Sequence, residues 1–251
     1  MKTKLLIILT LSFLTCFFSC KKSPLTIGKI VTVNRELPDF YEVRLNDDIN
    51  LVLEHSNTNS IIITTGENIV DQITTEVKDG VLTISNTTTM SWIRPYDYER
   101  TATLYYKDIT NFVFGASGTL KSTGTYNNET DNPDGHYRFE VDGGSGDVNL
   151  CINNCKRFDV VYRYGTSRVN LRGQNNRNLV VEKRSYGIFD ARDLCADSVA
   201  IMSKTPAHSY IWANKSIKAN ILHHGNVYYK GEPDSISVTY GEYAEGKLIP
   251  F

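Results

Sequence analysis

The sequence has no excess of charge of either sign. Its 251 residues include 27 lysines and arginines against 28 aspartates and glutamates, for a formal net charge of −1. Proteins that bind nucleic acid usually carry a strongly basic surface, so we expect no nucleic-acid partner. The hydrophobic share of 41% also excludes an intrinsically disordered chain.

The residue spacings of common metal and catalytic sites are also missing. After the N-terminal segment only Cys151, Cys155 and Cys195 remain, which are too few for two closely spaced pairs of the zinc type, and the five histidines do not form H-E-x-x-H. No G-x-S-x-G nucleophile motif occurs. We therefore expect no catalytic residue, no metal and no cofactor. Cys151 and Cys155 could close a small disulfide loop in an oxidising compartment, but idle thiols are the simpler interpretation.

Long apolar runs are absent except at the start of the chain. Lys2 and Lys4 precede an apolar run over residues 5–18, which is typical of a signal peptide and too short to span a bilayer comfortably. The run ends in F-F-S-C at Cys20. A small residue followed by cysteine resembles a bacterial lipobox, although Phe17 stands where the usual motif has leucine.

This start predicts a lipoprotein. We expect a signal peptide over residues 1–19, a lipid-modified Cys20 and a polar tether over residues 20–26. The alternative is an ordinary signal peptide that contains cysteines. A lipid anchor would make the membrane one partner and would place the protein at the bacterial outer membrane, on the cell surface or on the periplasmic face.

Glycine is concentrated in one stretch, V-D-G-G-S-G-D-V-N-L, from Val141 to Leu150. A phosphate-binding loop would need a lysine followed by serine or threonine, or a helix opening after the glycines. Here the glycines lead into an alternating pattern that is typical of a strand. The stretch is therefore predicted to be a turn.

Period-2 apolar runs recur about every twenty residues in the second half of the chain. Phe139 is followed one such interval later by Phe158, Val160 by Val181, and Val181 by Ile201. A second set of runs alternates with the first: Val148–Leu150, Val169–Leu171, Phe189–Ala191, Ile211–Ala213 and Val227–Tyr229. A turn lies between the two sets in every repeat: residues 143–146, 164–167, 184–187, 205–209 and 223–226.

These repeats predict an all-β fold with a parallel β-helix over residues 108–251. Each coil would stack on its neighbour to bury an apolar face, with glycine at the corners because it tolerates positive φ. A β-sandwich is the rival architecture. Residues 27–107 are expected to form a β-rich cap that includes a hairpin turn at Lys78–Gly80 and one helical turn within Asn68–Gln72.

Several motifs together resemble one known family, the bacterial putative auto-transporter adhesin, head GIN domain family. The motifs are the lipoprotein-like start and, in order, F-x-x-V at Phe40, K-D-G-V-L-T-I at Lys78, F-G-A-S-G-T-L at Phe114, G-G-S-G-D-V at Gly143 and V-Y-Y-K-G-E-P at Val227. The resemblance implies a right-handed, pectin-lyase-like parallel β-helix with a role in cell-surface adhesion. Bulkier residues replace the expected S-G-S-G at residues 164–167 and 205–209.

Basic and aromatic residues gather on two successive repeats. The candidate ligand-binding residues are Arg163, Tyr164, Arg168, Lys183, Arg184 and Tyr186. Arg163 and Arg184 are one period apart and should stack, which is unfavourable unless an anion or a carboxylate such as Glu182 or Asp142 balances them. A solvated surface ladder and a ligand site are both open interpretations. Trp92 and Trp212 could stack on sugars, but packing is the default interpretation.

The predicted function is therefore non-enzymatic. A cell-envelope lipoprotein for adhesion or ligand binding fits best, with a surface protein or a glycan as partner. The alternative is a carbohydrate-active, or degenerate polysaccharide-processing, β-helix, which would need carboxylates converging on one face. Five aspartates are available but occupy different positions in their repeats: Asp147, Asp159, Asp190, Asp193 and Asp197. A structural envelope lipoprotein without external ligand is a third possibility.

Overall fold

The computed structural model describes residues 26–88, 98–127, 132 and 134–251. The predicted signal peptide, Cys20, most of the tether and Trp92 lie outside these residues. The described chain is built from strands with one 3-10 turn, η2 (Val70–Gln72), so the all-β prediction is confirmed. None of the described segments forms a helix with the length and hydropathy needed to cross a membrane.

The strands form one open sheet. In chain order they are β1 (Ile30–Glu36), β2 (Glu42–Asp47), β3 (Asn50–His55), β4 (Ser60–Gly66), β5 (Ile73–Lys78), β6 (Val81–Asn86), β7 (Arg100–Tyr106), β8 (Asn111–Ala116), β9 (Leu120–Thr125), β10 (His136–Asp142), β11 (Asp147–Cys151), β12 (Arg157–Tyr164), β13 (Arg168–Lys183), β14 (Phe189–Ser203), β15 (Ser209–Ile221), β16 (Val227–Lys230), β17 (Ser235–Tyr240) and β18 (Leu248–Pro250). Along most of these strands, buried side chains alternate with partly or fully exposed ones, which is the period of a strand with one apolar face.

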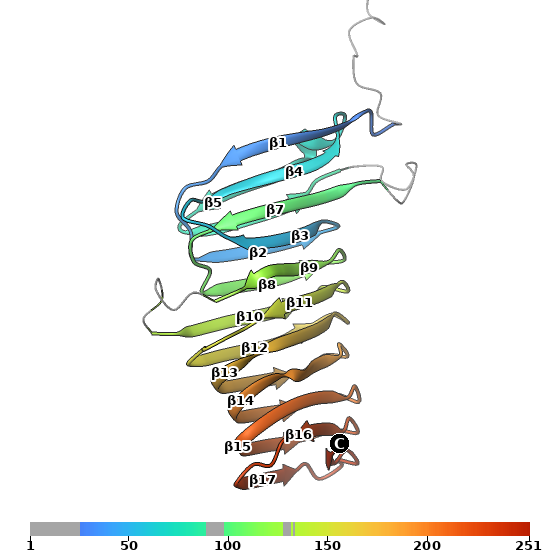
Figure 1. The fold of residues 1–251 in the computed structure, drawn as a ribbon. Helices are drawn as coiled ribbons and strands as arrows, with labels where there is room; N and C mark the ends of the chain where they lie inside the picture. Colours follow the sequence, from blue (N-terminus) through green and yellow to red (C-terminus); the bar gives the residue numbers. More distant parts are fainter. Residues whose placement is uncertain (1–25, 89–97, 128–131, 133) are drawn as a thin grey trace, which may run out of the picture.

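Parallel pairing arranges most strands in two ladders (Figure 1). Ladder A runs β6, β2, β8, β10 and β12, then the second halves of β13, β14 and β15, and then β17. Ladder B runs β7, β3, β9 and β11, then the first halves of the same three long strands, and then β16 and β18. The long strands β13, β14 and β15 therefore belong to both ladders.

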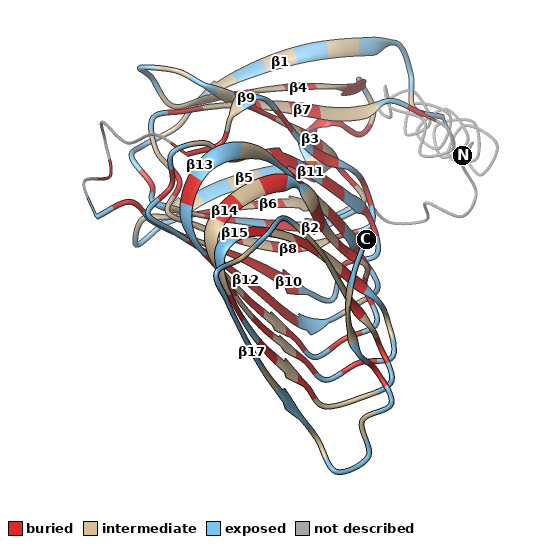
Figure 2. Cartoon of the chain, turned by 60° about the horizontal axis from the view of Figure 1, so that its bottom comes forward, coloured by how far each residue is buried: buried red, intermediate tan, exposed pale blue. Residues whose placement is uncertain are grey.

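Inward side chains stack in columns along each ladder, and buried segments recur on successive strands in Figure 2. Val160, Val181 and Ile201 are paired in register and buried, so the predicted column is confirmed. The predicted match of Phe139 with Phe158 is wrong, because Phe139 pairs with Val160. The two registers differ by a shift of two positions, which keeps the same side chains inward, so the apolar pattern cannot tell them apart.

The N-terminal region combines antiparallel and parallel pairing. β5 and β6 form the predicted hairpin, with positive φ at Asp79 (52°) and Gly80 (77°) as a tight turn requires. The predicted helical turn is η2. Parallel stacking begins earlier than the expected start at residue 108, because β2 and β3 pair directly with β8 and β9.

The glycine-dense stretch is a turn between β10 and β11, as predicted. Its glycines have two different roles. Gly143 has a φ of 94°, which a residue with a side chain rarely adopts. Gly146 has no positive φ, but a Cβ placed there would lie 1.8 Å from the carbonyl oxygen of Gly118. Gly146 is therefore required by the close approach of two turns.

Gly146→Val should destabilise the protein by about 2–3 kcal/mol, because a branched side chain would overlap backbone that cannot move aside cheaply. Gly124→Val is the matched control, since a Cβ at Gly124 meets nothing within 4 Å. Urea unfolding measures both variants. Equal stability of the two would contradict the close approach at Gly146.

Candidate ligand-binding cleft

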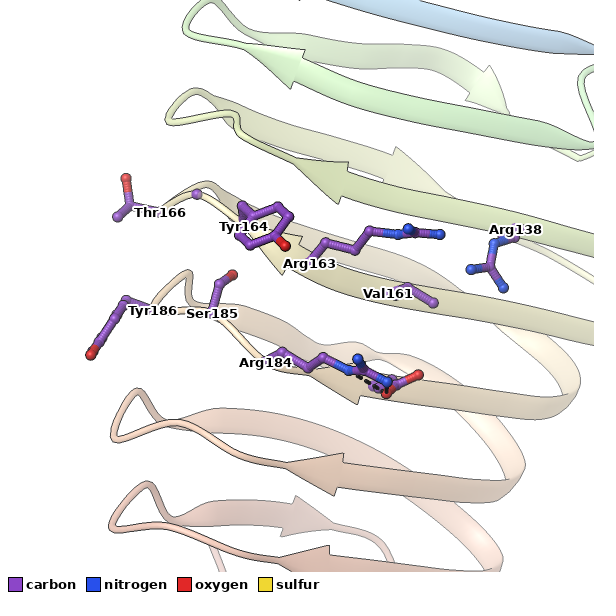
Figure 3. A pocket seen from close by; sticks show the side chains of 10 residues that line it. Arg138, Val161, Arg163, Tyr164, Thr166, Arg184, Ser185 and Tyr186 are labelled. Atoms are coloured by element: carbon purple, nitrogen blue, oxygen red, sulfur yellow. Dashed lines mark hydrogen bonds and ion pairs between the residues drawn. The ribbon is translucent and has the colours of Figure 1, made fainter.

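A cleft of about 760 Å³ opens on the outward face of ladder A, over β10, β12 and β13 and the turns that follow β12 and β13. Its walls carry two exposed tyrosines and three arginines (Figure 3). The lining residues are Arg138, Val161, Arg163, Tyr164, Gly165, Thr166, Glu182, Arg184, Ser185 and Tyr186. The volume lies within the range of small-molecule binding sites.

A β-bulge shapes the cleft. Val141 pairs with Tyr162, but the next residue, Asp142, pairs with Tyr164, so Arg163 is an extra residue in β12. A bulge bends its strand and redirects the neighbouring side chains. Tyr164, just after the bulge, is 70% exposed. The irregularity therefore presents an arginine and a tyrosine to solvent next to each other.

The turn after the bulge departs from S-G-S-G, as the sequence showed, without breaking the stack. Gly165 keeps a φ of 97°, and its backbone approaches that of Gly144 so closely that a Cβ would lie 2.2 Å from the Gly144 oxygen. The glycine that the corner requires is thus retained. The bulkier Tyr164 and Thr166 on either side of it line the cleft.

The arginines are held by two glutamates. Glu140, almost fully buried, accepts one hydrogen bond from Arg138 at 3.2 Å and pairs through its other oxygen with Arg163. Arg184 donates from Nε to Glu182 at 2.5 Å. Glu182 is thus one of the two predicted carboxylate partners, and Glu140 was missed. Such charge-assisted bonds fix the direction of each guanidinium group.

The cleft has two chemically different ends. In Figure 3 the side chains of Arg138, Arg163 and Arg184 extend toward Val161, whereas Tyr186 points away from them on the side of the turns. Tyr186 is 69% exposed. One end therefore presents guanidinium groups above a small apolar floor, and the other end presents an aromatic ring.

Four of the six predicted ligand residues come together here: Arg163, Tyr164, Arg184 and Tyr186. Arg168 does not line this cleft, because it is the first residue of β13 and pairs with Asp147 in ladder B. Lys183 does not reach the surface at all. Its side chain is fully buried, and its Nζ donates to the carbonyl oxygens of Ala207 at 3.0 Å and His208 at 2.7 Å.

Lys183 faces inward because it pairs with Tyr162 on the buried side of ladder A. Its Nζ also lies 3.2 Å from the hydroxyl of Ser209, so all three donors of an ammonium group have acceptors. Burial nevertheless disfavours the charged form and lowers the pKa of Lys183 to about 7. Lys183 therefore belongs to the interior of the fold.

Arg138 and Glu140 are the cleft residues that sequence reasoning missed. They lie on β10, one repeat before Asp159 and Val161 of β12, with which they pair. The same offset that relates Val160 to Val181 would have placed them near Arg163. The sequence obscures that offset in the first repeat, because Phe158 is also an apolar residue at a suitable spacing from Phe139.

The five candidate aspartates are dispersed, with one exception. Asp190 and Asp193 both line a second cleft of about 520 Å³ on ladder B. Asp190 accepts a hydrogen bond from Arg192 at 2.8 Å. Asp159 pairs with Arg157 at 2.8 Å and His136 at 3.0 Å, and Asp197 pairs with Lys215 at 2.9 Å. Asp159, Asp190 and Asp197 therefore each have a structural partner.

The tryptophan and the cysteines considered in the sequence contact other residues of the fold. Lys230 lies over the ring of Trp212, with its Nζ 4.1 Å from the ring centroid. No disulfide joins Cys151 to Cys155 in the described chain, and the thiol of Cys155 lies 3.6 Å from the oxygen of Gly135. Within the same residues, histidine, cysteine and acidic side chains do not gather in a group of three that could hold a metal.

Three solved structures illustrate the fold that this chain shares. The chain is similar to a putative adhesin from Bacteroides fragilis NCTC 9343, with a TM-score of 0.75 and 19% identity over 90% of this chain and 99% of that one. A putative lipid binding protein from Parabacteroides distasonis ATCC 8503 gives a TM-score of 0.65 and 19% identity, over 89% of this chain and 97% of that one. A putative adhesin from Parabacteroides merdae ATCC 43184 gives a TM-score of 0.60 and 15% identity, over 89% of this chain and 97% of that one.

No curated protein sequence matches the chain. The family model described as putative auto-transporter adhesin, head GIN domain, matches residues 39–233. The match covers well over half of the sequence and includes β10, β12 and β13, the strands beneath the cleft. The family that the motifs at Phe114 and Gly143 indicated is thus confirmed, and the chain belongs to the putative auto-transporter adhesin, head GIN domain family.

Proposed function

We propose that this protein is a non-enzymatic adhesion or ligand-binding protein of the cell envelope, and that the cleft on ladder A holds the ligand. The observation that supports this most is the cleft itself. It brings Arg163, Tyr164, Arg184 and Tyr186 to one exposed site. Arginine and tyrosine are enriched where proteins recognise partners, and the family name points to adhesion at the cell surface.

We also propose that the two ladders wind as a right-handed parallel β-helix. The support is the pairing: Val160 pairs with Val181 and Val181 with Ile201, so each layer repeats the one before it along the sequence. The long strands β13, β14 and β15 pass from one ladder to the other within each layer. A stack of this kind would present the cleft on a rigid surface.

A lipid at Cys20 would attach this surface to the bacterial outer membrane. The support is the sequence F-F-S-C after an apolar run, followed by a polar tether. The cleft would then face outward from the cell or into the periplasm. Shaving of intact cells with protease distinguishes the two faces, because only a surface-exposed protein is cleaved.

Cys20→Ala should abolish labelling of the protein with a radioactive fatty acid and release it from the membrane fraction, because the thiol that carries the lipid is lost. Cys16→Ala, within the apolar run, is the matched control and should leave the labelling unchanged. A Cys20→Ala protein that is still labelled and membrane-bound would exclude the lipobox.

Binding is tested by screening the purified mature protein, from residue 20 onward, against glycans and extracellular matrix proteins. Arg163→Ala and Arg184→Ala should each weaken binding to the ligand found by at least tenfold, because hydrogen bonds to charged groups contribute about 1.5–3 kcal/mol. Lys218→Ala is the control, because Lys218 is an exposed cation on ladder A outside the cleft. If all three variants bind the ligand as tightly as the wild-type protein, the binding site lies outside the cleft.

Polysaccharide processing is the second candidate function, and one observation favours it. Asp190 and Asp193 share the second cleft, as a pair of catalytic carboxylates would. Arg192 donates a hydrogen bond to Asp190, so that carboxylate already has a structural partner. Release of reducing sugar ends from a polysaccharide panel, lost in Asp193→Asn, would support this function over adhesion.

A further inference from the structure

The charges in the cleft on ladder A do not balance. Three arginines line or enter it, and two glutamates hold them. Glu140 serves both Arg138 and Arg163, one through each oxygen, so these two guanidinium groups share a single negative charge. Each guanidinium has five N–H donors, and a carboxylate cannot satisfy two such groups. The site therefore has donors and positive charge to spare.

Unused guanidinium donors beside a concave surface match one kind of ligand group. Arginine binds planar or tetrahedral oxyanions through parallel N–H bonds, which is the geometry of carboxylate and sulfate recognition. The floor between these arginines is Val161, a small, nearly buried residue that leaves room above it. An anionic oxygen group of a ligand fits at this end of the cleft.

The exposed tyrosines of the cleft indicate which kind of molecule carries the anionic group. Tyr164 and Tyr186 expose about 70% of their surface in the same cleft. An exposed tyrosine presents an apolar ring and a polar hydroxyl together, which suits the mixed apolar and hydroxyl faces of a sugar ring. Tyr164 follows Arg163 directly in the chain, whereas Tyr186 points away from the arginines (Figure 3). An occupant that contacts both Tyr186 and the guanidinium groups therefore extends along the cleft.

A protein partner fits this surface less well. Stable protein interfaces bury about 1,600 Å² around an apolar centre. The two tyrosines are the exposed large hydrophobic residues of this cleft, and its lining also carries the exposed, charged side chains of Arg138, Arg163 and Arg184. A concave and charged site suits a short anionic chain.

We infer that the cleft binds an acidic oligosaccharide, with a carboxylate or sulfate group on Arg163, Arg138 and Arg184 and a sugar ring against Tyr164 or Tyr186. This inference rests on the proposed function, because it names the ligand class of the same cleft. The two glutamates hold the guanidinium groups in place before the ligand arrives, and the ligand anion supplies the missing negative charge.

The test is calorimetric titration of the mature protein with four probes of similar length: a glucuronic acid oligosaccharide, a sulfated glucose oligosaccharide, a neutral glucose oligosaccharide and a glutamate peptide. One or both acidic sugars should bind at least tenfold more tightly than the neutral sugar and the peptide. Their affinity should fall as salt rises from about 50 to about 500 mM, in the manner of screened charges. The two acidic probes distinguish carboxylate from sulfate as the group recognised.

Arg163→Gln and Arg184→Gln should each weaken the acidic sugars at least tenfold. Glu140 keeps Arg138 as its partner in the first variant, so the fold is retained. Lys218→Gln, with the same change of charge outside the cleft, should leave the affinity unchanged. Arg163→Lys should recover only part of the affinity, because lysine lacks the planar fork.

Two kinds of failure are distinguishable. Binding of the neutral sugar or the peptide as tightly as the acidic sugars, with loss on Tyr164→Ala but not on Arg163→Gln, would overturn the acidic ligand and leave the cleft as a binding site. Absence of binding by every probe would also overturn the acidic ligand. The proposed function itself fails if the broad screen finds a ligand that no cleft variant weakens.

Discussion

Val181→Asp should unfold the protein or lower its free energy of unfolding by about 4 kcal/mol or more. Val181 is buried in the middle of a column, between Val160 of the preceding strand and Ile201 of the next. A carboxylate at this position would lose its hydration with no cation or donor within the column to compensate it. The buried Lys183 on the same face already donates to three other acceptors. Each layer is stabilised mainly by its neighbours, so the damage should extend over several layers.

Val180→Asp is the matched control for this prediction. Val180 is the preceding residue of β13, and its side chain lies on the opposite, partly exposed face of the strand. A carboxylate there keeps contact with water, so the change should cost less than about 1 kcal/mol. Thermal and urea unfolding measure both variants. Similar losses of stability for the two would contradict the register of ladder A.

The stability of the folded protein should rise as the pH is raised from 7 toward 10, through the contribution of Lys183. Burial lowers the pKa of Lys183 to about 7, whereas an unfolded lysine keeps its ordinary value of 10.5. Between these values the unfolded chain binds more protons than the folded one, so raising the pH favours folding. The gain across the interval is on the order of a few kcal/mol.

This contribution is isolated by comparison with Lys183→Met, which fills a similar volume and does not titrate. The difference in free energy of unfolding between the two proteins should change by a few kcal/mol between pH 7 and 9.5. Burial raises the pKa values of Tyr126 and Tyr162 in both proteins, so the contributions of these tyrosines cancel in the difference. A difference that stays constant with pH would show that the three acceptors keep Lys183 charged in the folded protein and that its pKa is not lowered.

Much of the C-terminal stack could be predicted from the sequence because its signal is local and repeated. Val160, Val181 and Ile201 alternate with polar residues and recur at nearly constant spacing, so both the inward face and the stacking partner follow. The first repeat is the exception. Both Phe158 and Val160 are apolar and suitably spaced partners for Phe139, and either choice keeps Phe139 inward.

The N-terminal topology could not be predicted in the same way. Strand β2 pairs with β8, far along the chain, through Glu42 and Asn111. Strand β4 runs antiparallel between β1 and β7. Such pairings follow no sequence period. The local hairpin at Asp79 and Gly80 was predictable because the turn chemistry is contained within a few residues.

The candidate cleft was predicted in part for the same reasons. Arg163 and Arg184 are one period apart, so their proximity follows from the repeat. Lys183 was assigned to the surface because of its charge, although its alternation with Leu179 and Val181 places it inward. The bulge that exposes Arg163 was not predictable, because an extra residue in one strand changes neither composition nor period.

A crystal structure of the mature protein with the tightest acidic oligosaccharide from the titration tests the binding site most directly. The site predicts an anionic group of the sugar within hydrogen-bonding distance of the guanidinium groups of Arg163 and Arg184, with a sugar ring against Tyr164 or Tyr186. A sugar bound elsewhere, with the cleft on ladder A filled only by water, would contradict it.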